Sequence, residues 1–407
     1  MKIKKCRLCK NDKLSFLFSL GELSFTGKFS KNAKINIPKK TVSLVICDKC
    51  KLVQLSQNFN PKYLYGKDYG YRTGINSTMT NHVRNIVYEA QKLSKIKKGE
   101  FVLDIASNDG TMLNFYQKDL ITVGIDPILS KFNKFYKNIN FKVSNFFSLD
   151  VLKKNKLFKK YKIISALSVF YDVKAPNNFL KDIKKILHID GIFILEHADL
   201  LSIVKNNLFD TICHEHLEYY STKVIVNMMN KNDLRVFNLK KNNINGGSIR
   251  YYISHSNSRY KVNNKKISSV IKEENRMKLE KISTYKSFLK KIDKQKNKLN
   301  NFLNAMLKQK KIIHGYGAST KGNVLLQYFK INKDQINFIA DRNPKKNNFY
   351  TPGTKIKIIS EKKSRKMNPD FYLVLPWHFR DEILKRETKM IRKGTRFIFP
   401  LPKLKVS

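Results

Sequence analysis

A buried strand that runs directly into a polar loop limits the fold of this sequence more than any other feature. Residues 101–110 read F-V-L-D-I-A-S-N-D-G, an apolar run closed by turn-forming residues. Such a run is typical of a strand in a parallel sheet, because both faces of that kind of sheet are covered. We therefore expect an α/β domain in which the chain turns sharply from this strand into a helix.

Strands and helices alternate beyond this loop, as a parallel sheet requires. A second strand, residues 121–125, ends at Asp126. The expected elements that follow are strands at 139–143, 161–167 and 191–196 and a helix at 175–188. Two later strands, 234–240 and 248–254, would add an antiparallel pair at the edge of the sheet.

The ends of these strands indicate what the domain binds. An acid such as Asp126, after the second strand, is what a ribose diol requires. The G-x-G-x-x-G of NAD-binding folds is missing, and a single Gly110 preceded by Asn-Asp is the form found with S-adenosylmethionine (SAM). Ordinary capping or packing is the alternative for each residue. The predicted SAM contacts are Asp104, Asn108, Gly110, Asp126, Asn145 and Phe146.

Four of the five cysteines form two Cys-x-x-Cys pairs. The pairs are Cys6 with Cys9 and Cys47 with Cys50, and each places two thiolates on a tight turn. Two such knuckles close a tetrahedral zinc site, whereas a redox role would need one pair inside a βαβ unit. Because all four ligands come from the protein, we expect a structural zinc ion, with strands inserted between the knuckles.

The stretch Thr211–Ser221 contains the strongest candidates for chemistry. It reads T-I-C-H-E-H-L-E-Y-Y-S and places His214, Glu215 and His216 side by side. Groups that titrate near neutral pH stand next to groups that can orient them, which suits a base that removes a proton from carbon. A polar helix start or a solvated loop is the simpler interpretation of an isolated His-x-His.

A tyrosine-rich segment precedes the first strand of the α/β domain. Tyr63, Tyr65, Tyr69 and Tyr71 alternate with glycines that interrupt any helical period, so a shaped loop or lid is expected. These rings could instead pack a domain junction. A helix at about 79–95 follows.

A second Rossmann-like unit is predicted near the C-terminus. A lysine- and glutamate-rich helical segment, about 260–309, leads into K-I-I-H-G-Y-G-A-S-T-K-G at 311–322. Thr320 takes the place of the third glycine of the dinucleotide motif, which argues against NAD. The helix start near Ser319 and the side chain of Lys321 would still suit a phosphate.

Length and charge limit the class of protein. A chain of 407 residues is long enough for two or three domains. Its 81 basic and 31 acidic residues give a formal charge of +50, but the lysines are spread evenly, so nucleic acid is an unlikely partner and anionic small molecules are favoured. With no secretion signal and no apolar run of about 20 residues, we expect a cytoplasmic protein with no membrane contact.

Together these motifs resemble the zinc-containing, SAM-dependent C-methyltransferases of deoxysugar biosynthesis. The resemblance rests on the paired Cys-x-x-Cys, V-L-D-I-A-S-N-D-G, H-E-H with its trailing aromatics, and G-Y-G-A-S-T-K-G, and it covers nearly the whole chain in order. It implies a zinc-binding domain at 1–60, a methyltransferase domain at 61–258 and a helical linker with a Rossmann-like domain at 259–407.

The resemblance also implies a substrate and a set of catalytic residues. Such enzymes methylate the carbon beside the ketone of nucleotide-linked 4-keto-6-deoxyhexoses. His216 matches the base of the family, Glu215 and His214 stand beside it, and Tyr71 or Tyr69 matches a tyrosine that faces the substrate. We expect a monomer that binds a nucleotide-diphosphate keto-sugar, with the diphosphate toward Ser319 and Lys321.

Two departures from the family pattern leave the sugar and the methylated carbon open. Cys213 stands where the family has a tyrosine, and Asp172 where it has a histidine. Three other functions compete. An RNA methyltransferase would also combine zinc knuckles, a SAM fold and a high pI; a dehydrogenase would use the C-terminal unit; and a scaffold would need no base.

Overall fold

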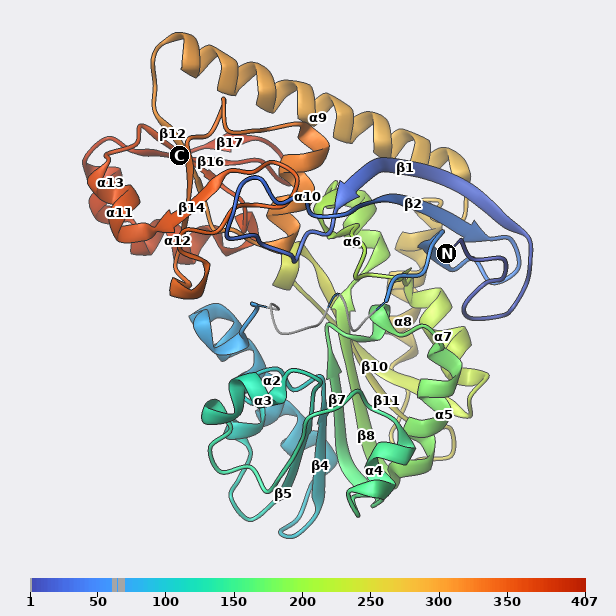
Figure 1. Cartoon of the computed structure of the whole chain (residues 1–407). Coiled ribbons are helices and arrows are strands. Elements are labelled where there is room, and N and C mark those ends of the chain that lie inside the picture. Colours follow the sequence, from blue (N-terminus) through green and yellow to red (C-terminus); the bar gives the residue numbers. More distant parts are fainter. Residues whose placement is uncertain (1, 61–63, 65–69) are drawn as a thin grey trace.

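Three β-sheets, joined by helices, form the part of the molecule that the structure describes. The computed structural model describes residues 2–60, 64 and 70–407 (Figure 1). Tyr63, Tyr65 and Tyr69 of the tyrosine-rich segment lie outside the described residues. No helix in the described ranges is long and apolar enough to cross a lipid bilayer.

The first sheet is antiparallel and joins distant parts of the chain. Its order is β1-β2-β3-β9. The strands are β1 (Leu14–Ser24), β2 (Lys39–Cys47), β3 (Val53–Leu55) and β9 (Glu218–Tyr219). Val53 pairs with Tyr219 and Gln54 with Glu218. The strand that follows H-E-H is therefore an edge strand of the sheet that carries the cysteines.

The central sheet has the predicted α/β architecture. Its order is β10-β11-β8-β7-β4-β5-β6, with β11 antiparallel to both of its neighbours. The strands are β4 (Phe101–Ile105), β5 (Ile121–Ile125), β6 (Phe141–Val143), β7 (Tyr161–Leu167), β8 (Leu187–Ala198), β10 (Leu234–Asn242) and β11 (Ser248–His255). The expected antiparallel pair at the edge is present.

Alternating apolar side chains cover both faces of this sheet. Val102 packs in one core with residues of α2, whereas Leu103 packs in another with residues of α5. Because successive side chains of a strand point to opposite faces, a strand buried on both sides reads as a continuous apolar run. The helices are α2 (Ser77–Ser94), α3 (Leu129–Phe132), α4 (Leu149–Lys154), α5 (Pro176–Ile186), α6 (Leu200–Lys205) and α7 (Thr222–Asn230).

The third sheet is a second Rossmann-like unit, as the sequence predicts. Its order is β14-β13-β12-β15-β16-β17, with β17 antiparallel at the edge. The strands are β12 (Ile313–Tyr316), β13 (Phe338–Asp341), β14 (Lys357–Ser360), β15 (Phe371–Val374), β16 (Arg396–Phe399) and β17 (Lys405–Val406). Its helices are α10 (Thr320–Phe329), α11 (Glu361–Lys366), α12 (Arg380–Arg386) and α13 (Thr388–Arg392).

Two helices connect the central and third sheets. α8 (Asn264–Arg276) is followed by the long α9 (Ile282–Lys308), which passes over the first sheet toward the third (Figure 1). Phe288 of α9 lies 5.7 Å, ring to ring, from Phe18 of β1, and Gln295 donates to the carbonyl of Pro400 at 3.1 Å. α9 therefore holds the N-terminal and C-terminal sheets against each other.

A glycine turn lets the third sheet dock closely on the central one. Gly246, with a φ of +89°, faces the ring of Trp377, and a Cβ atom there would overlap that ring. The Trp377 indole donates to Asp210 Oδ2 at 2.8 Å. The absence of a side chain at Gly246 therefore makes room for the tryptophan that joins the two sheets.

We predict that Gly246→Ala destabilises the protein more than a matched glycine substitution elsewhere. Gly21→Ala is the control, because Gly21 has a φ of +79° and nothing within 4 Å of a built Cβ. Both variants carry the left-handed backbone cost of about 1–2 kcal/mol. Gly246→Ala should add about 1–3 kcal/mol for the steric overlap. Urea unfolding midpoints measure the difference, and equal midpoints would contradict this docking.

Candidate active site

One large cavity lies at the carboxyl ends of the central parallel strands. Its volume is about 620 Å³, and its lining comes from the segment after β1, from the central sheet and from the third sheet. Ligands of open α/β sheets bind at this edge, where the strand order reverses. Of the predicted site residues, the cavity brings together Tyr71, Asp104, Asn108, Asp126, Asn145, Phe146, Glu215 and His216.

Two buried acids line the cofactor end of the cavity. Asp126 accepts backbone N–H groups from Asn108 at 2.9 Å and Ile128 at 2.8 Å, so its carboxylate is held at the end of β5. Burial raises the pKa of Asp126 to about 6 and that of Asp104 to about 7. An acid fixed in this way and facing a cavity suits the hydroxyl groups of a ribose.

The loop after β4 is shaped by left-handed residues and packed on Tyr136. Ala106 and Asn108 have φ values of +59° and +53°, and the Tyr136 hydroxyl donates to the Asn108 carbonyl at 3.0 Å. Gly110 does not line the cavity. Its φ is +73°, and a Cβ there would lie 2.9 Å from the Tyr136 ring. Gly110 therefore shapes the loop.

The segment after the tyrosine-rich region holds this loop from outside. Arg72 pairs with Asp109 at 2.9 Å, and the Thr73 N–H donates to Asn108 Oδ1 at 3.0 Å. Tyr71, 43% exposed, lines the cavity next to them.

An exposed aromatic ring completes the cofactor end. Phe146, after β6, is 39% exposed and lines the cavity beside Asn145. An apolar ring facing a cavity offers a surface that a nucleoside base can cover. Paired with the acid at the end of β5, it makes this end of the cavity fit the adenosine part of SAM.

His216 is held as a neutral base at the other end of the cavity. Its Nδ1–H donates to the Thr211 carbonyl at 2.7 Å, and the Tyr171 ring lies 4.2 Å away, centroid to centroid. Nε2 has no hydrogen-bond partner among the described residues and is left with its lone pair. Burial, opposed by the Thr211 carbonyl and reinforced by Lys321, lowers the pKa of His216 to about 4.

Glu215 is held by the segment that follows β1. The Thr26 hydroxyl contacts the two Glu215 oxygens at 3.3 and 3.5 Å, and a Cβ on Gly27 would lie 3.2 Å from Glu215 Oε1. The sequence places Glu215 beside His216, among the groups that could orient its imidazole. In the described structure that contact belongs to Thr211, and Glu215 presents its carboxylate to the cavity.

His214 lies outside the cavity. Its Nε2 faces the Lys40 carbonyl at 3.1 Å, and its ring packs between Phe25 and Phe59 at centroid distances of 4.7 and 4.9 Å. Burial lowers its pKa. This imidazole is a packing group between the first sheet and the H-E-H segment, so we assign it no catalytic role.

The two departures from the family pattern have different locations. Asp172 lines the cavity. Cys213 is fully buried outside it, and burial together with nearby Glu215 raises the pKa of its thiol well above the usual value. Cys213 is thus a neutral thiol behind the site, whereas Asp172 places a carboxyl group where a substrate can meet it.

The C-terminal unit contributes two groups to the cavity, Lys321, which the sequence places at the diphosphate, and His378, which is not among the predicted site residues. Lys321 lines the cavity and donates to the Asn245 carbonyl at 3.0 Å. His378, next to Trp377, also lines it, and burial with the Lys321 charge lowers its pKa well below the usual value. The Pro376-Trp377-His378 segment shortly after strand β15 is the sequence signal that would have found His378.

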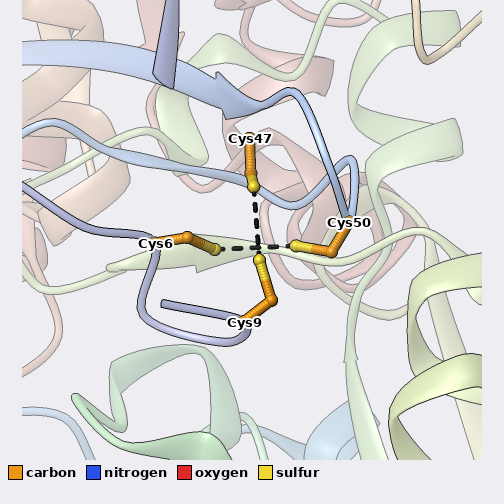
Figure 2. A group of neighbouring side chains, drawn as sticks. All are labelled: Cys6, Cys9, Cys47 and Cys50. Carbon is orange, nitrogen blue, oxygen red and sulfur yellow. Dashed lines mark hydrogen bonds between the residues drawn. The ribbon is translucent and has the colours of Figure 1, made fainter. Parts of the chain in front are cut away.

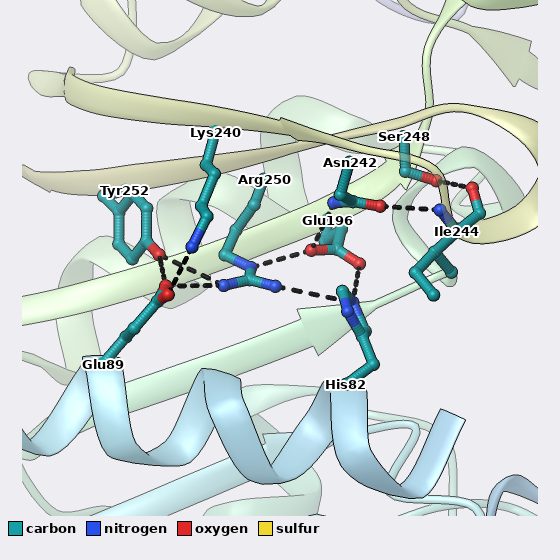
Figure 3. Close-up of polar contacts among 9 residues, drawn as sticks. All are labelled: His82, Glu89, Glu196, Lys240, Asn242, Ile244, Ser248, Arg250 and Tyr252. Carbon is teal, nitrogen blue, oxygen red and sulfur yellow. Dashed lines mark hydrogen bonds and ion pairs between the residues drawn. The ribbon is translucent and has the colours of Figure 1, made fainter. Parts of the chain in front are cut away.

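A buried ionic network fixes the helix that covers the cofactor side. His82 of α2 lies 2.5 Å from Glu196 of β8, and Arg250 of β11 contacts both Glu196 and Glu89 at 2.8 Å (Figure 3). His82 and Glu196 also line the cavity. Burial opposes ionisation of Glu196, but His82 and Arg250 lower its pKa below the usual value. The network therefore holds α2 in a defined position at the cavity wall.

The four predicted zinc ligands converge. All four Sγ atoms of Cys6, Cys9, Cys47 and Cys50 lie within 4.8 Å of one another, and two pairs are 3.4 and 3.5 Å apart (Figure 2). A tetrahedron with Zn–S bonds of about 2.3 Å has S–S edges of about 3.8 Å, so the donor set fits zinc.

The zinc knuckle is tied to the strand that follows His216. Arg7, between two of the cysteines, donates to the Leu55 carbonyl at 2.7 Å and to the Leu217 carbonyl at 3.4 Å. Gln54 donates to Cys6 Sγ at 3.3 Å and accepts the Arg7 N–H at 3.1 Å. The metal centre therefore supports the H-E-H segment without reaching the cavity.

Three family models match successive parts of the chain. Residues 6–65 match the "Putative zinc binding domain", residues 80–239 the "Methyltransferase domain" and residues 243–402 the "C-methyltransferase C-terminal domain". The chain belongs to the C-methyltransferase family. It is a SAM-dependent methyltransferase with a zinc-binding domain.

This C-methyltransferase is similar over its full length to a known enzyme. C-methyltransferase NovU of Streptomyces niveus is 25% identical over 414 residues, which cover 99% of this chain and 97% of that protein.

Two solved structures each resemble less than half of the chain. A SAM-dependent methyltransferase from Clostridium acetobutylicum is 13% identical, covers 43% of this chain and 92% of its own, and has a TM-score of 0.36. Magnesium protoporphyrin IX methyltransferase from Synechocystis is 13% identical, covers 47% and 92%, and has a TM-score of 0.34.

We predict that Gln54→Leu weakens zinc binding about 10–100-fold, because Gln54 orients both Cys6 and Arg7 from outside the ligand shell. Competition with a chromogenic chelator measures the affinity. Gln57→Leu is the control, because the Gln57 contact with Arg7 is made by its backbone carbonyl. Equal zinc affinities of the two variants would contradict the role of Gln54.

We predict that the His216 imidazole stays neutral well below the ordinary histidine pKa of about 6.5. With a pKa of about 4, it is protonated only as the pH falls through that value. Long-range proton–nitrogen NMR measures the tautomer, and the His216 signal is assigned by its absence from the spectrum of His216→Asn. We expect this signal to show the Nδ1–H tautomer throughout pH 5–8. Titration of that signal near pH 6.5 would show that the imidazole is not held as described.

Proposed function

We propose that this C-methyltransferase adds a methyl group to the carbon beside the ketone of a nucleotide-linked 4-keto-6-deoxysugar. The observation that carries the proposal is the orientation of His216. Its Nδ1–H is held by the Thr211 carbonyl, so the unprotonated Nε2 is available in the cavity that Asp126 and Phe146 share. A neutral imidazole facing a substrate space is the group that removes a proton from carbon.

The residues of the chain divide the chemistry between them. Nε2 of His216 takes the proton from the carbon beside the ketone, and the electron pair moves onto the ketone oxygen. SAM supplies the electrophilic methyl group, so the new carbon–carbon bond forms as the methyl–sulfur bond breaks and sulfur keeps its pair. Glu215, held by Thr26, accepts a hydrogen bond from a sugar hydroxyl and keeps the ring oriented.

The nucleotide part of the substrate lies against the third sheet. Ser319 begins α10 at the cavity, and Arg342 and Lys346 line the same wall. A helix start and two cations suit a diphosphate. The formal charge of +50 on the chain also favours an anionic substrate.

The test is methyl transfer to a panel of nucleotide 4-keto-6-deoxysugars, followed by mass spectrometry. We expect one member of the panel to gain one methylene mass, and His216→Asn to lower the rate by at least about 100-fold. His188→Asn is the control, because His188 lies at the start of β8 and does not line the cavity.

Two outcomes would overturn the proposal. The first is a failure to methylate any keto-sugar by a protein that binds both zinc and SAM. The second is a methylated product in His216→Asn at the wild-type rate. Salt-sensitive methylation of RNA, in place of the sugars, would favour the RNA alternative.

A further inference from the structure

Lys321 is fixed at the catalytic end of the cavity. It lies in the first turn of α10, and its Nζ donates to the Asn245 carbonyl at 3.0 Å. The Asn245 backbone is left-handed, with a φ of +57°, and the adjoining Gly246 receives the Trp377 ring. The contact that docks the third sheet therefore also places this lysine.

The base and the lysine are close enough to influence each other. The Lys321 charge contributes to the low pKa of His216 and also to that of His378. In the other direction, burial lowers the pKa of Lys321, while Asp210 and Cys213 oppose that shift. Both imidazoles are neutral at pH 7, whereas a lysine has an ordinary pKa of about 10.4 and is the cation among these three groups.

Lys321 has no contacting counter-ion in the described part of the chain. No carboxylate of the described residues forms an ion pair with its Nζ. Asp210, which accepts the Trp377 indole N–H, acts on Lys321 only through space. A partly buried ammonium without a paired anion is costly, and two of its three N–H groups are left to donate. Such a group is stabilised when a ligand brings negative charge to it.

We propose that Lys321 is a catalytic residue that stabilises the negative charge formed on the ketone oxygen when His216 removes the neighbouring proton. This assignment rests on the proposed function. The proton passes from carbon to His216 Nε2, and the electron pair comes to rest on the oxygen beside the Lys321 ammonium. After methyl transfer, the carbonyl reforms and the imidazolium returns its proton to water.

The chemistry needs such a cation. An imidazole with a pKa of about 4 is a weak base toward the carbon beside a ketone. A fixed donor aimed at the oxygen where charge develops lowers the barrier, and loss of one such donor typically costs about 100–1,000-fold in rate. Burial is the main cause of the low pKa of His216, and the Lys321 charge adds to it, so the imidazole is unprotonated before the reaction.

The contacts of Lys321 differ from those of the cations proposed to bind the diphosphate. Arg342 and Lys346 stand at the end of β13, and Lys346 is 3.5 Å from Asp341. Lys321 instead contacts the Asn245 turn of the central sheet and lies within electrostatic reach of Cys213, next to H-E-H. In this proposal the diphosphate lies at the helix start near Ser319 with Arg342 and Lys346, and the Lys321 ammonium faces the ketone oxygen.

The test is exchange of the carbon-bound proton in D₂O without SAM, at saturating keto-sugar, followed by NMR. Lys321→Met should lower the exchange rate about 100–1,000-fold and change the dissociation constant of the keto-sugar less than about threefold. The acid limb of its exchange rate should also move to slightly higher pH, because burial still lowers the His216 pKa but the smaller contribution of the Lys321 charge is gone. SAM binding by calorimetry confirms that the variant folds.

Two further variants sharpen the result. Lys321→Arg keeps the positive charge but replaces the compact ammonium with a planar guanidinium. We therefore expect an exchange rate between those of the wild type and Lys321→Met. Lys333→Met removes the same charge from an exposed site after α10 and should exchange at the wild-type rate.

Three outcomes count against the assignment. Unchanged exchange in Lys321→Met with at least about tenfold weaker sugar binding would make Lys321 a substrate-binding group only. Loss of exchange in Lys333→Met to the same extent would show a nonspecific charge effect. A wild-type enzyme that neither exchanges nor methylates any keto-sugar would overturn the proposed function and this assignment with it.

Discussion

The hydrogen bond from His216 Nδ1 to the Thr211 carbonyl is the interaction on which the active site depends. It closes a short loop whose two ends are held by different parts of the molecule. On the N-terminal side of Thr211, Asp210 accepts a hydrogen bond from Trp377, next to the third sheet. On the C-terminal side of His216, Glu218 and Tyr219 form β9 of the first sheet. The base is thus positioned by the docking of all three sheets, and the zinc knuckle acts on it through Arg7 and Leu217.

The electrostatics of the site follow from this arrangement. Burial and the Lys321 charge keep His216 neutral, which leaves its lone pair available but makes it a weak base. A weak base can act on a carbon acid when the product charge is stabilised where it appears. The segment after β1 contributes Thr26 behind Glu215, and the segment before β9 contributes the base. The cofactor acids come from the central sheet and the cation from the first helix turn after β12. No single domain contains the complete site.

The sequence predicts the fold well where the signal is local. The apolar run at β4, Asp126 after β5 and the strand at β12 each depend on neighbouring residues, and the structure has them in place. The site depends on distant packing, and there prediction was partial. His214 and His216 look alike in sequence, but Phe25 and Phe59 enclose the first and the cavity receives the second. Thr26 and Glu215, 189 residues apart, carry no local sign of contact.

The most direct test of carbon methylation is the position of the new methyl group. SAM with a carbon-13 methyl group, transferred to a sugar labelled with carbon-13 throughout its ring, gives a product whose bonds NMR can read. The account predicts one-bond carbon–carbon coupling between the methyl group and the ring carbon beside the ketone. A methyl signal without that coupling, as on oxygen or nitrogen, would contradict the account.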